Sequence, residues 1–297
     1  MNQQATEPIG HSAFTSAGDV EAALRGRGYL ADHGLATAMF LALKMRRPLL
    51  LEGEAGVGKT QVAKTLADLL GSELIRLQCY EGIDAAQAIY EWDYPRQLLY
   101  SRSESQNGSN LRGQLYTSDF LLERPILRAV RAGARAVLLV DELDRADDEF
   151  EAFLLEALSE YSVTVPEFGT IRAPEPPVVV ITSNRTRELH DALKRRCLYH
   201  WIEYPSFERE MDIIRLHVPA ASAALVESVA TAVARLRELD LVKSPGVAEA
   251  IDWTVAATLI HAPALDRASA DVTLGAAVKN REDVAHVRSR LVDLFDG

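Results

Sequence analysis

The sequence predicts an α/β fold in which a parallel sheet carries helices on both faces and a smaller all-helical part follows. Two apolar runs, residues 137–140 and 178–181, are typical of parallel strands buried on both faces. A third apolar run, residues 49–51, leads directly into a glycine-rich turn and a helix. Beyond Pro205 only segments with helical periodicity follow, so we expect the sheet to end near that residue.

The composition is that of a soluble globular protein, with 48% hydrophobic and 25% charged residues among 297. No apolar run reaches the roughly 20 residues of a membrane helix, and the N-terminal residues do not resemble a secretion signal. We therefore expect a cytoplasmic protein without a transmembrane segment. A net charge of -11 argues against constitutive nucleic-acid binding. Cys79 and Cys197 are too few for a disulfide framework and are expected to be small buried residues.

The turn after the first strand carries the full phosphate-binding P-loop pattern, Gly-x-x-x-x-Gly-Lys-Thr, at residues 53–60. Its glycines let successive N–H groups point at a polyphosphate, and the helix that follows directs its N-terminal dipole at the same anion. Lys59 would contact the β- and γ-phosphates, and the Thr60 hydroxyl would ligate Mg²⁺. A structural turn with a chance Lys-Thr pair is the alternative, and the order strand, loop, helix disfavours it. The predicted residues for ATP are Gly53, Glu54, Ala55, Gly56, Val57, Gly58, Lys59, Thr60 and Gln61.

Two carboxylates follow the apolar strand that ends at residue 140. Asp141 would hold Mg²⁺, directly or through water, as the second acidic residue of a P-loop site does. Glu142 would polarise an attacking water mainly by orienting it, because a carboxylate with an ordinary pKa is a weak base. Alone, such a pair is most often an exposed strand end. Together with the P-loop it predicts nucleotide hydrolysis.

Three further residues complete the candidate catalytic set. Asn184 follows the strand at residues 178–181 and would contact the γ-phosphate and the lytic water, although asparagine is also a common turn residue there. Arg195 or Arg196, with Arg196 favoured, would stabilise transition-state charge in the site of a neighbouring subunit. The alternative for this pair is a solvated basic cluster at a helix C-terminus.

The expected organisation has three parts. Residues 1–17 would form a flexible tail, residues 18–205 the α/β nucleotide-binding core, and residues 206–297 a helical lid. The core would contain a polar insertion at about residues 84–116, with a helix starting near Asp84, and a hairpin at about residues 162–173. Expected lid helices lie at about residues 207–217, 221–239, 247–260, 268–278 and 282–294.

The P-loop, the Asp141-Glu142 strand end, Asn184, Arg196 and a helical lid together resemble an AAA+ ATPase. Within that class, residues 141–146, Asp-Glu-Leu-Asp-Arg-Ala, are similar to the Asp-Glu-hydrophobic-Asn-Arg-Ala stretch of the MoxR family. The insertion and the hairpin match that family's layout. Residues 78–82, 90–94, 246–249 and 252–253 look most like the subgroup associated with carbon monoxide dehydrogenase maturation. The resemblance covers about residues 20 to 262.

This resemblance implies a ring homo-oligomer, usually a hexamer, whose ATPase site is shared between subunits. It also implies a chaperone-like remodelling role in maturing a metalloenzyme or its cofactor, with a von Willebrand factor A domain protein as partner. One departure concerns the lid, which often begins Ser-Pro-Arg with the arginine sensing the γ-phosphate. Here the residues are Ser-Pro-Gly, so Gly246 would leave lid coupling weaker or dependent on another residue. Arg145 has a family precedent as an intersubunit contact and would equally suit a surface salt bridge.

Three other functions compete with a remodelling ATPase. A nucleotide-gated scaffold with little hydrolysis is favoured by the missing lid arginine and opposed by Glu142 and Asn184. A DNA-associated loader is disfavoured by the acidic net charge. A small-molecule P-loop kinase is disfavoured by the long helical lid and by the pair Arg195 and Arg196.

Overall fold

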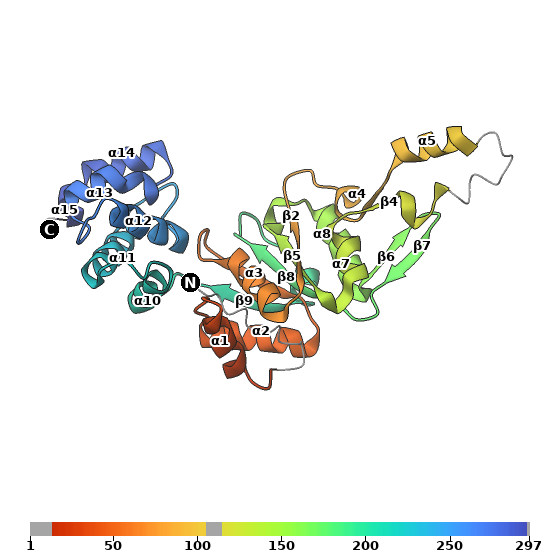
Figure 1. Cartoon of the computed structure of the whole chain (residues 1–297), viewed down its shortest axis with the longest axis horizontal. Helices are drawn as coiled ribbons and strands as arrows, with labels where there is room; N and C mark the ends of the chain where they lie inside the picture. Colours follow the sequence, from red (N-terminus) through yellow and green to blue (C-terminus); the bar gives the residue numbers. More distant parts are fainter. Residues whose placement is uncertain (1–13, 105–114, 296–297) are drawn as a thin grey trace. The chain divides into compact units, whose positions relative to one another are not determined.

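The α/β part is built on a five-stranded sheet with the order β2-β5-β8-β1-β9 (Figure 1). This computed structural model describes residues 14–104 and 115–295, so most of the expected tail lies outside the described residues. The pairs β1–β8, β5–β8 and β2–β5 are parallel, as predicted. The strands are β1 (Leu49–Gly53), β2 (Glu73–Gln78), β5 (Ala136–Asp141), β8 (Val178–Ser183) and β9 (Leu198–Ile202).

The strand order brings the polar strand ends together. β1 and β5 are buried along their whole length, and β8 is buried from its second residue onward. Because β8 lies between β5 and β1, the carboxyl ends of these three strands meet at one edge of the sheet. The P-loop, the pair of carboxylates and Asn184 follow these three ends.

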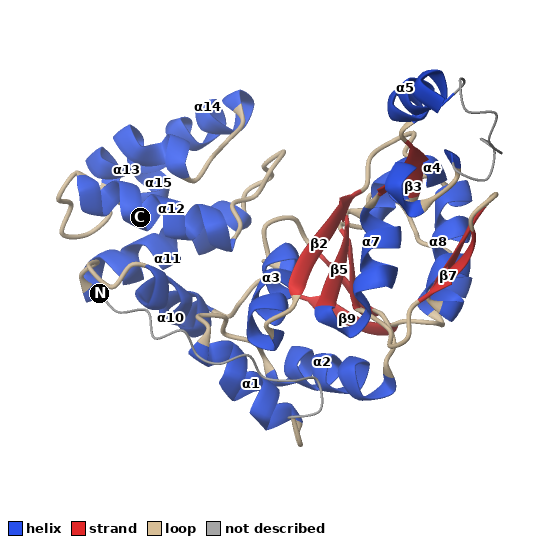
Figure 2. Cartoon of the chain, turned by 45° about the vertical axis from the view of Figure 1, so that its right-hand side comes forward, coloured by secondary structure: helices blue, strands red, loops and turns tan. Residues whose placement is uncertain are grey.

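Helices cover both faces of this sheet, which confirms the predicted fold class. In Figures 1 and 2, α3 lies on one side of the sheet, and α7 and α8 lie on the other. Pro125 opens α7, where its missing N–H costs no hydrogen bond. Gly71 follows α3 with a φ of 61°, a left-handed conformation typical of a residue that ends a helix. Outside the insertion, the helices of eight or more residues in this part are α1 (Ala17–Gly26), α2 (His33–Met45), α3 (Lys59–Leu70), α7 (Pro125–Ala132) and α8 (Asp148–Glu160).

The insertion contains more secondary structure than the single helix that the sequence predicts near Asp84. The helix expected at Asp84 is only α4 (Ala85–Ala88), although Asp84 does accept a hydrogen bond from the Gln87 N–H at 2.8 Å. After it, β3 (Tyr90–Trp92) pairs antiparallel with β4 (Leu121–Glu123), and α5 (Tyr94–Glu104) lies between them in the chain. Residues 105–114 lie outside the described part.

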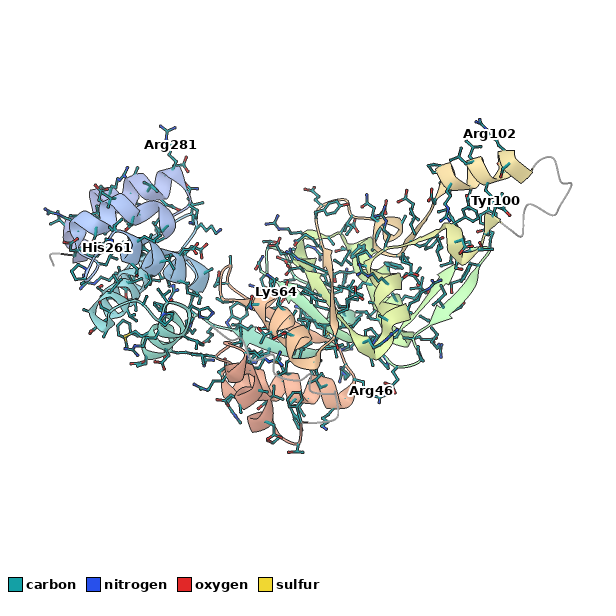
Figure 3. The ribbon with its side chains drawn as sticks, in the orientation of Figure 1. Arg46, Lys64, Tyr100, Arg102, His261 and Arg281 are labelled. Atoms are coloured by element: carbon teal, nitrogen blue, oxygen red, sulfur yellow. The ribbon has the colours of Figure 1, made fainter. Side chains whose placement is uncertain are left out.

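Aromatic packing explains this structured insertion. The Trp92 and Tyr116 rings lie 5.1 Å apart, and Tyr100 of α5, labelled in Figure 3, lies 5.5 Å from Phe120. Both pairs are edge-to-face, a favoured geometry for aromatic rings. Because the middle of this stretch is polar, its composition does not indicate that the aromatic residues at its two ends pack together. The predicted hairpin is also present, as β6 (Ser162–Val165) and β7 (Gly169–Arg172).

The C-terminal part is helical, as predicted, and has a core of its own. Trp253 at its centre is 1% exposed, and its indole N–H donates to Thr273 Oγ1 at 2.8 Å. The helix expected at residues 282–294 is interrupted at Arg290. None of the described helices is long and apolar enough to cross a membrane. The helices are α10 (Phe207–His217), α11 (Ala223–Arg237), α12 (Val247–Leu259), α13 (Arg267–Thr273), α14 (Arg281–Ser289) and α15 (Leu291–Phe295).

Two compact units divide the chain. Among the described residues, the first contains residues 14–24, 31–52, 60–104 and 115–201, and the second contains residues 25–30, 53–59 and 202–295. The P-loop residues up to Lys59 thus group with the helical part, while Thr60 groups with the sheet.

The two cysteines give a first testable prediction. Both are buried, as expected, and burial raises the pKa of each thiol to about 12. Because the thiolate is the reactive form, Cys79 and Cys197 should remain unmodified by a disulfide-exchange reagent at pH 8 in the native protein. In denaturant, where a thiol pKa is about 8.5, both should react rapidly. A native thiol that reacts at the denatured rate would contradict this burial.

Candidate nucleotide-binding site

The P-loop lysine is folded back onto its own loop. Lys59 Nζ donates to the carbonyl oxygens of Gly53 and Glu54, at 2.7 Å in both cases, and its side chain is buried. A buried ammonium group requires such acceptors, because an unpaired charge away from water is costly. Phosphate oxygens would therefore have to replace these two carbonyls as partners of Lys59.

Thr60 and Asp141 meet at the end of the sheet. The Thr60 hydroxyl lies 3.0 Å from Asp141 Oδ1 and 3.3 Å from Oδ2. The Asp141 side chain is 2% exposed. Its Oδ1 also accepts a hydrogen bond from the Thr182 hydroxyl at 2.7 Å. The two residues predicted to hold Mg²⁺ are thus adjacent in the fold.

The chemistry of this pair fits Mg²⁺. A hydroxyl and a carboxylate are hard oxygen donors, and Mg²⁺ commonly takes one or two protein oxygens together with phosphates and water. Among the residues that the structure describes, no cluster of three or more His, Cys, Asp or Glu side chains could hold a metal by itself. Metal binding here would accordingly depend on the phosphates of a nucleotide.

Glu142 follows Asp141 in a constrained conformation. Its φ is 56°, in the left-handed region that non-glycine residues rarely adopt. Its N–H donates to Thr182 Oγ1 at 2.9 Å, so the same hydroxyl contacts both halves of the acidic pair. The Glu142 carboxylate lies 2.8 Å from Arg145 Nε, which gives Arg145 a salt bridge within this chain. Such strain at a strand end is common where a side chain must face a ligand.

Asn184 and Gln61 are two further residues that the sequence predicts for this site. Asn184 is half-buried and follows β8 directly, and the β5–β8 pairing places Val140 opposite Ile181. Asn184 therefore emerges from the same edge of the sheet as the acidic pair. Gln61 is an exposed residue of α3 whose amide nitrogen lies 3.4 Å from Thr65 Oγ1.

Arg195 and Arg196 are exposed residues that follow α9 (Asp191–Lys194). The Arg47 guanidinium holds their backbone, because it donates to the carbonyl oxygens of Arg195 and Arg196, the second at 2.9 Å. Both arginines line a surface hollow of about 340 Å³ together with Arg46, which is labelled in Figure 3. Exposure on a fixed turn is what a residue acting on a neighbouring molecule requires.

The absence of an arginine at position 246 has a steric explanation within the second unit. Gly246 precedes α12, and a Cβ on it would lie 2.6 Å from both the Cα and the carbonyl oxygen of Gly56. The Val247 N–H donates to that carbonyl at 3.0 Å, and Gly56 itself has a φ of 82°. Side chains cannot occupy this space, so an arginine at position 246 would not fit. The P-loop backbone instead contacts the start of α12 directly.

Arg237 fixes the turn that carries Gly246. Its Nε donates to the Pro245 carbonyl at 2.9 Å, and its two Nη atoms contact the buried Glu210 carboxylate at 2.8 and 2.7 Å. Its guanidinium also lies 4.3 Å from the centre of the Tyr204 ring. The Tyr204 hydroxyl in turn donates to the Ala55 carbonyl at 3.3 Å. Sequence reasoning missed this network, because its members are far apart along the chain.

The fold and this strand edge define a P-loop ATPase of the AAA+ class. Residues 48–197 match the family model described as "AAA domain (dynein-related subfamily)". The chain belongs to this family and is an AAA+ ATPase of the dynein-related, MoxR-like kind.

The chain is also similar to several individual proteins. An uncharacterised Bacillus subtilis protein, YeaC, is 28% identical over 210 residues, which are 68% of this chain and 57% of that protein. The gas vesicle ATPase GvpN1 of Halobacterium salinarum is 25% identical over 276 residues, 86% of this chain and 75% of GvpN1. Midasin of Giardia intestinalis is 28% identical over 149 residues, 48% of this chain and 2% of midasin. The chain thus spans little more than half of the first relative and a small part of midasin.

Among solved structures, a RuvB mutant of Thermotoga maritima matches with a TM-score of 0.51 and 16% identity, over 98% of this chain and 82% of that one. A second RuvB mutant matches with a TM-score of 0.50 and 17% identity. At this identity the likeness shows the fold alone.

The Gly246–Gly56 contact predicts that Gly246→Ala destabilises the protein. Its Cβ would force α12 away from the P-loop backbone, and overpacking of this kind costs about 1–3 kcal/mol. Thermal unfolding should show a melting temperature several degrees below that of the unsubstituted protein. Gly275→Ala is the matched control, since no atom lies within 4 Å of a Cβ added there. Equal melting temperatures for the two variants would contradict the contact.

Proposed function

We propose that this chain is an ATP-hydrolysing remodelling ATPase of the MoxR type. The observation that supports this best is the cluster at the end of β5, where Thr60, Asp141 and Thr182 are joined by hydrogen bonds and Glu142 follows directly. P-loop hydrolysis requires a hydroxyl and a carboxylate that hold Mg²⁺ and a further group that orients the attacking water.

The proposed binding step begins at the loop. ATP phosphates would accept hydrogen bonds from the N–H groups of residues 53–61 and would draw Lys59 from the carbonyls that it now contacts. Thr60 and Asp141 would hold Mg²⁺, which supplies charge neutralisation at the β- and γ-phosphates. Burial of Asp141 keeps competing water away from this carboxylate.

The proposed chemical step is attack of water on the γ-phosphate. Glu142 would accept a hydrogen bond from that water, and Asn184 would orient the water and the γ-phosphate. Arg196, or Arg195 beside it, would reach the γ-phosphate of a neighbouring subunit and stabilise its transition-state charge. The exposed turn held by Arg47 supports this assignment.

At the level of the whole protein, we assign residues 18–205 to the ATPase core and residues 206–297 to a lid. The proposed assembly is a cytoplasmic homo-oligomeric ring, most simply a hexamer. As chaperone-like substrates and partners we propose a metalloenzyme or its cofactor and a von Willebrand factor A domain protein, as in the subgroup associated with carbon monoxide dehydrogenase maturation.

A nucleotide-gated scaffold is the second candidate function. It is favoured by the Arg145–Glu142 ion pair, which occupies the carboxylate proposed to orient water. A scaffold would bind ATP and assemble without appreciable turnover. Phosphate release therefore separates the two functions.

The proposed enzyme predicts that Glu142→Gln binds ATP but hydrolyses it about 100-fold more slowly, because loss of correct positioning of a reacting group can cost about 10²-fold in rate. Phosphate release and nucleotide binding should be measured on the same preparations. Glu156→Gln, an exposed change on α8, should hydrolyse ATP at the unsubstituted rate. Equal, background-level release by the unsubstituted protein and Glu142→Gln would reject the enzyme and favour the scaffold.

Sharing of the site between subunits predicts complementation. Arg196→Ala and Glu142→Gln should each be inactive alone, since each removes one half of the site. Mixed rings should recover about a quarter of the unsubstituted rate, because random neighbours place an intact arginine next to an intact glutamate at that frequency. No recovery on mixing, despite assembly, would place Arg196 outside the shared site, and the same test with Arg195→Ala decides between the two arginines.

The remodelling role predicts that Glu142→Gln with ATP retains its assembled, client-bound state. We expect the oligomer to become larger on addition of ATP, by light scattering, and specific proteins to be recovered with it. Lys59→Ala is the control, since it should not bind ATP. An unchanged oligomer together with recovery of no partner would contradict the remodelling function.

A further inference from the structure

Arg76 of β2 forms an ion pair with the buried carboxylate of the candidate Mg²⁺ site. Its Nε and Nη2 donate to Asp141 Oδ2 at 2.9 and 2.6 Å. The Asp141 side chain is 2% exposed, whereas that of Arg76 is 50% exposed. A cation that is half in solvent therefore already occupies one oxygen of this carboxylate.

Strand pairing delivers Arg76 to this place. β2 pairs with β5 so that Gln78 lies opposite Asp141 and Arg76 lies opposite Leu139. Since side chains alternate between the faces of a sheet, Arg76, Gln78 and Asp141 share one face. Arg76 is thus the diagonal neighbour of Asp141, within reach of a long side chain. The pair follows from the register of two strands and does not depend on a loop.

Both oxygens of the Asp141 carboxylate have hydrogen-bond partners. Oδ1 faces the hydroxyls of Thr182 and Thr60, and Oδ2 takes both hydrogen bonds from Arg76. A divalent cation that approached Oδ2 would meet the guanidinium, and the two positive charges would repel each other. Arg76 Nη2 also contacts Gln78 Oε1, and the side chain is half exposed, so the guanidinium has a second partner and access to solvent besides Asp141.

We propose that Arg76 is a positioning residue that acts as the resident counter-ion of Asp141 and thereby sets the Mg²⁺ concentration needed for nucleotide binding. Without Mg²⁺, Arg76 compensates the buried charge of Asp141. When Mg²⁺ and a nucleotide bind, the guanidinium yields Oδ2 and remains with Gln78 and solvent. Thr182 keeps the carboxylate oriented in both states. The Mg²⁺ part of this inference rests on the proposed function.

The test is equilibrium binding of a fluorescent, non-hydrolysable ATP analogue while free Mg²⁺ is titrated. In Arg76→Gln, the free Mg²⁺ concentration at half-saturation should fall by roughly fivefold or more, the lower range of typical coupling between two binding events. Arg76→Lys keeps the positive charge without the two hydrogen bonds of the guanidinium. Its free Mg²⁺ concentration at half-saturation should lie between those of Arg76→Gln and the unsubstituted protein. Arg128→Gln is the matched control, because Arg128 of α7 forms an ion pair with Glu73, an exposed residue of β2. Its Mg²⁺ requirement should equal that of the unsubstituted protein. An unchanged or higher Mg²⁺ requirement in Arg76→Gln would overturn the proposal.

A thermal unfolding cycle tests the pair without nucleotide or Mg²⁺. Arg76→Gln should lower the melting temperature by a few degrees, because Asp141 loses its counter-ion. Addition of Asp141→Asn to that variant should lower it less than Asp141→Asn does alone, since the pair is already broken. Strictly additive effects would overturn the counter-ion role. If the analogue binds neither the unsubstituted protein nor any variant at any Mg²⁺ concentration, the proposed function is rejected, and with it the proposed effect of Arg76 on the Mg²⁺ requirement. The unfolding cycle still decides whether Arg76 compensates the charge of Asp141.

Discussion

The buried carboxylate of Asp141 is the constraint on which the candidate site depends. A carboxylate with 2% of its side chain exposed must be paired and hydrogen-bonded, because an uncompensated buried charge costs several kcal/mol. The fold supplies these partners from three elements: Thr60 from the start of α3, Thr182 from β8 and Arg76 from β2. Each of these partners lies on a different element next to the end of β5. The side chains that compensate one buried charge are therefore also the side chains that surround the candidate site.

The glycine pair Gly56 and Gly246 plays a comparable role in the second unit. Absence of a side chain at both positions lets the Val247 N–H reach the Gly56 carbonyl. This contact explains why Ser-Pro-Gly stands where an arginine would be expected. It joins the start of α12 to the P-loop through backbone atoms, without a charged side chain between them.

Much of this structure could be predicted from local sequence. Apolar runs that end in Asp141 or Asn184, and a P-loop pattern between a strand and a helix, are signals carried by adjacent residues. Arg76 could not be found that way, because an arginine in an edge strand has the appearance of a solvated residue until the order of the strands places β2 beside β5. Thr182 likewise gains its role only from the β5–β8 register. The strand pair β3–β4 and helix α5 in the insertion were not predicted for a similar reason, since Trp92 and Phe120 pack against Tyr116 and Tyr100, which are distant from them in the sequence.

Structure determination with Mg²⁺ and a non-hydrolysable ATP analogue is the most direct test of the central claim. The claim is that the ends of β1, β5 and β8 form one ATP site centred on Asp141. We expect the Thr60 hydroxyl on the metal, Asp141 on the metal or one of its waters, and Lys59 on the phosphates instead of the Gly53 and Glu54 carbonyls. A nucleotide bound elsewhere, or a metal held without Thr60 and Asp141, would contradict the account.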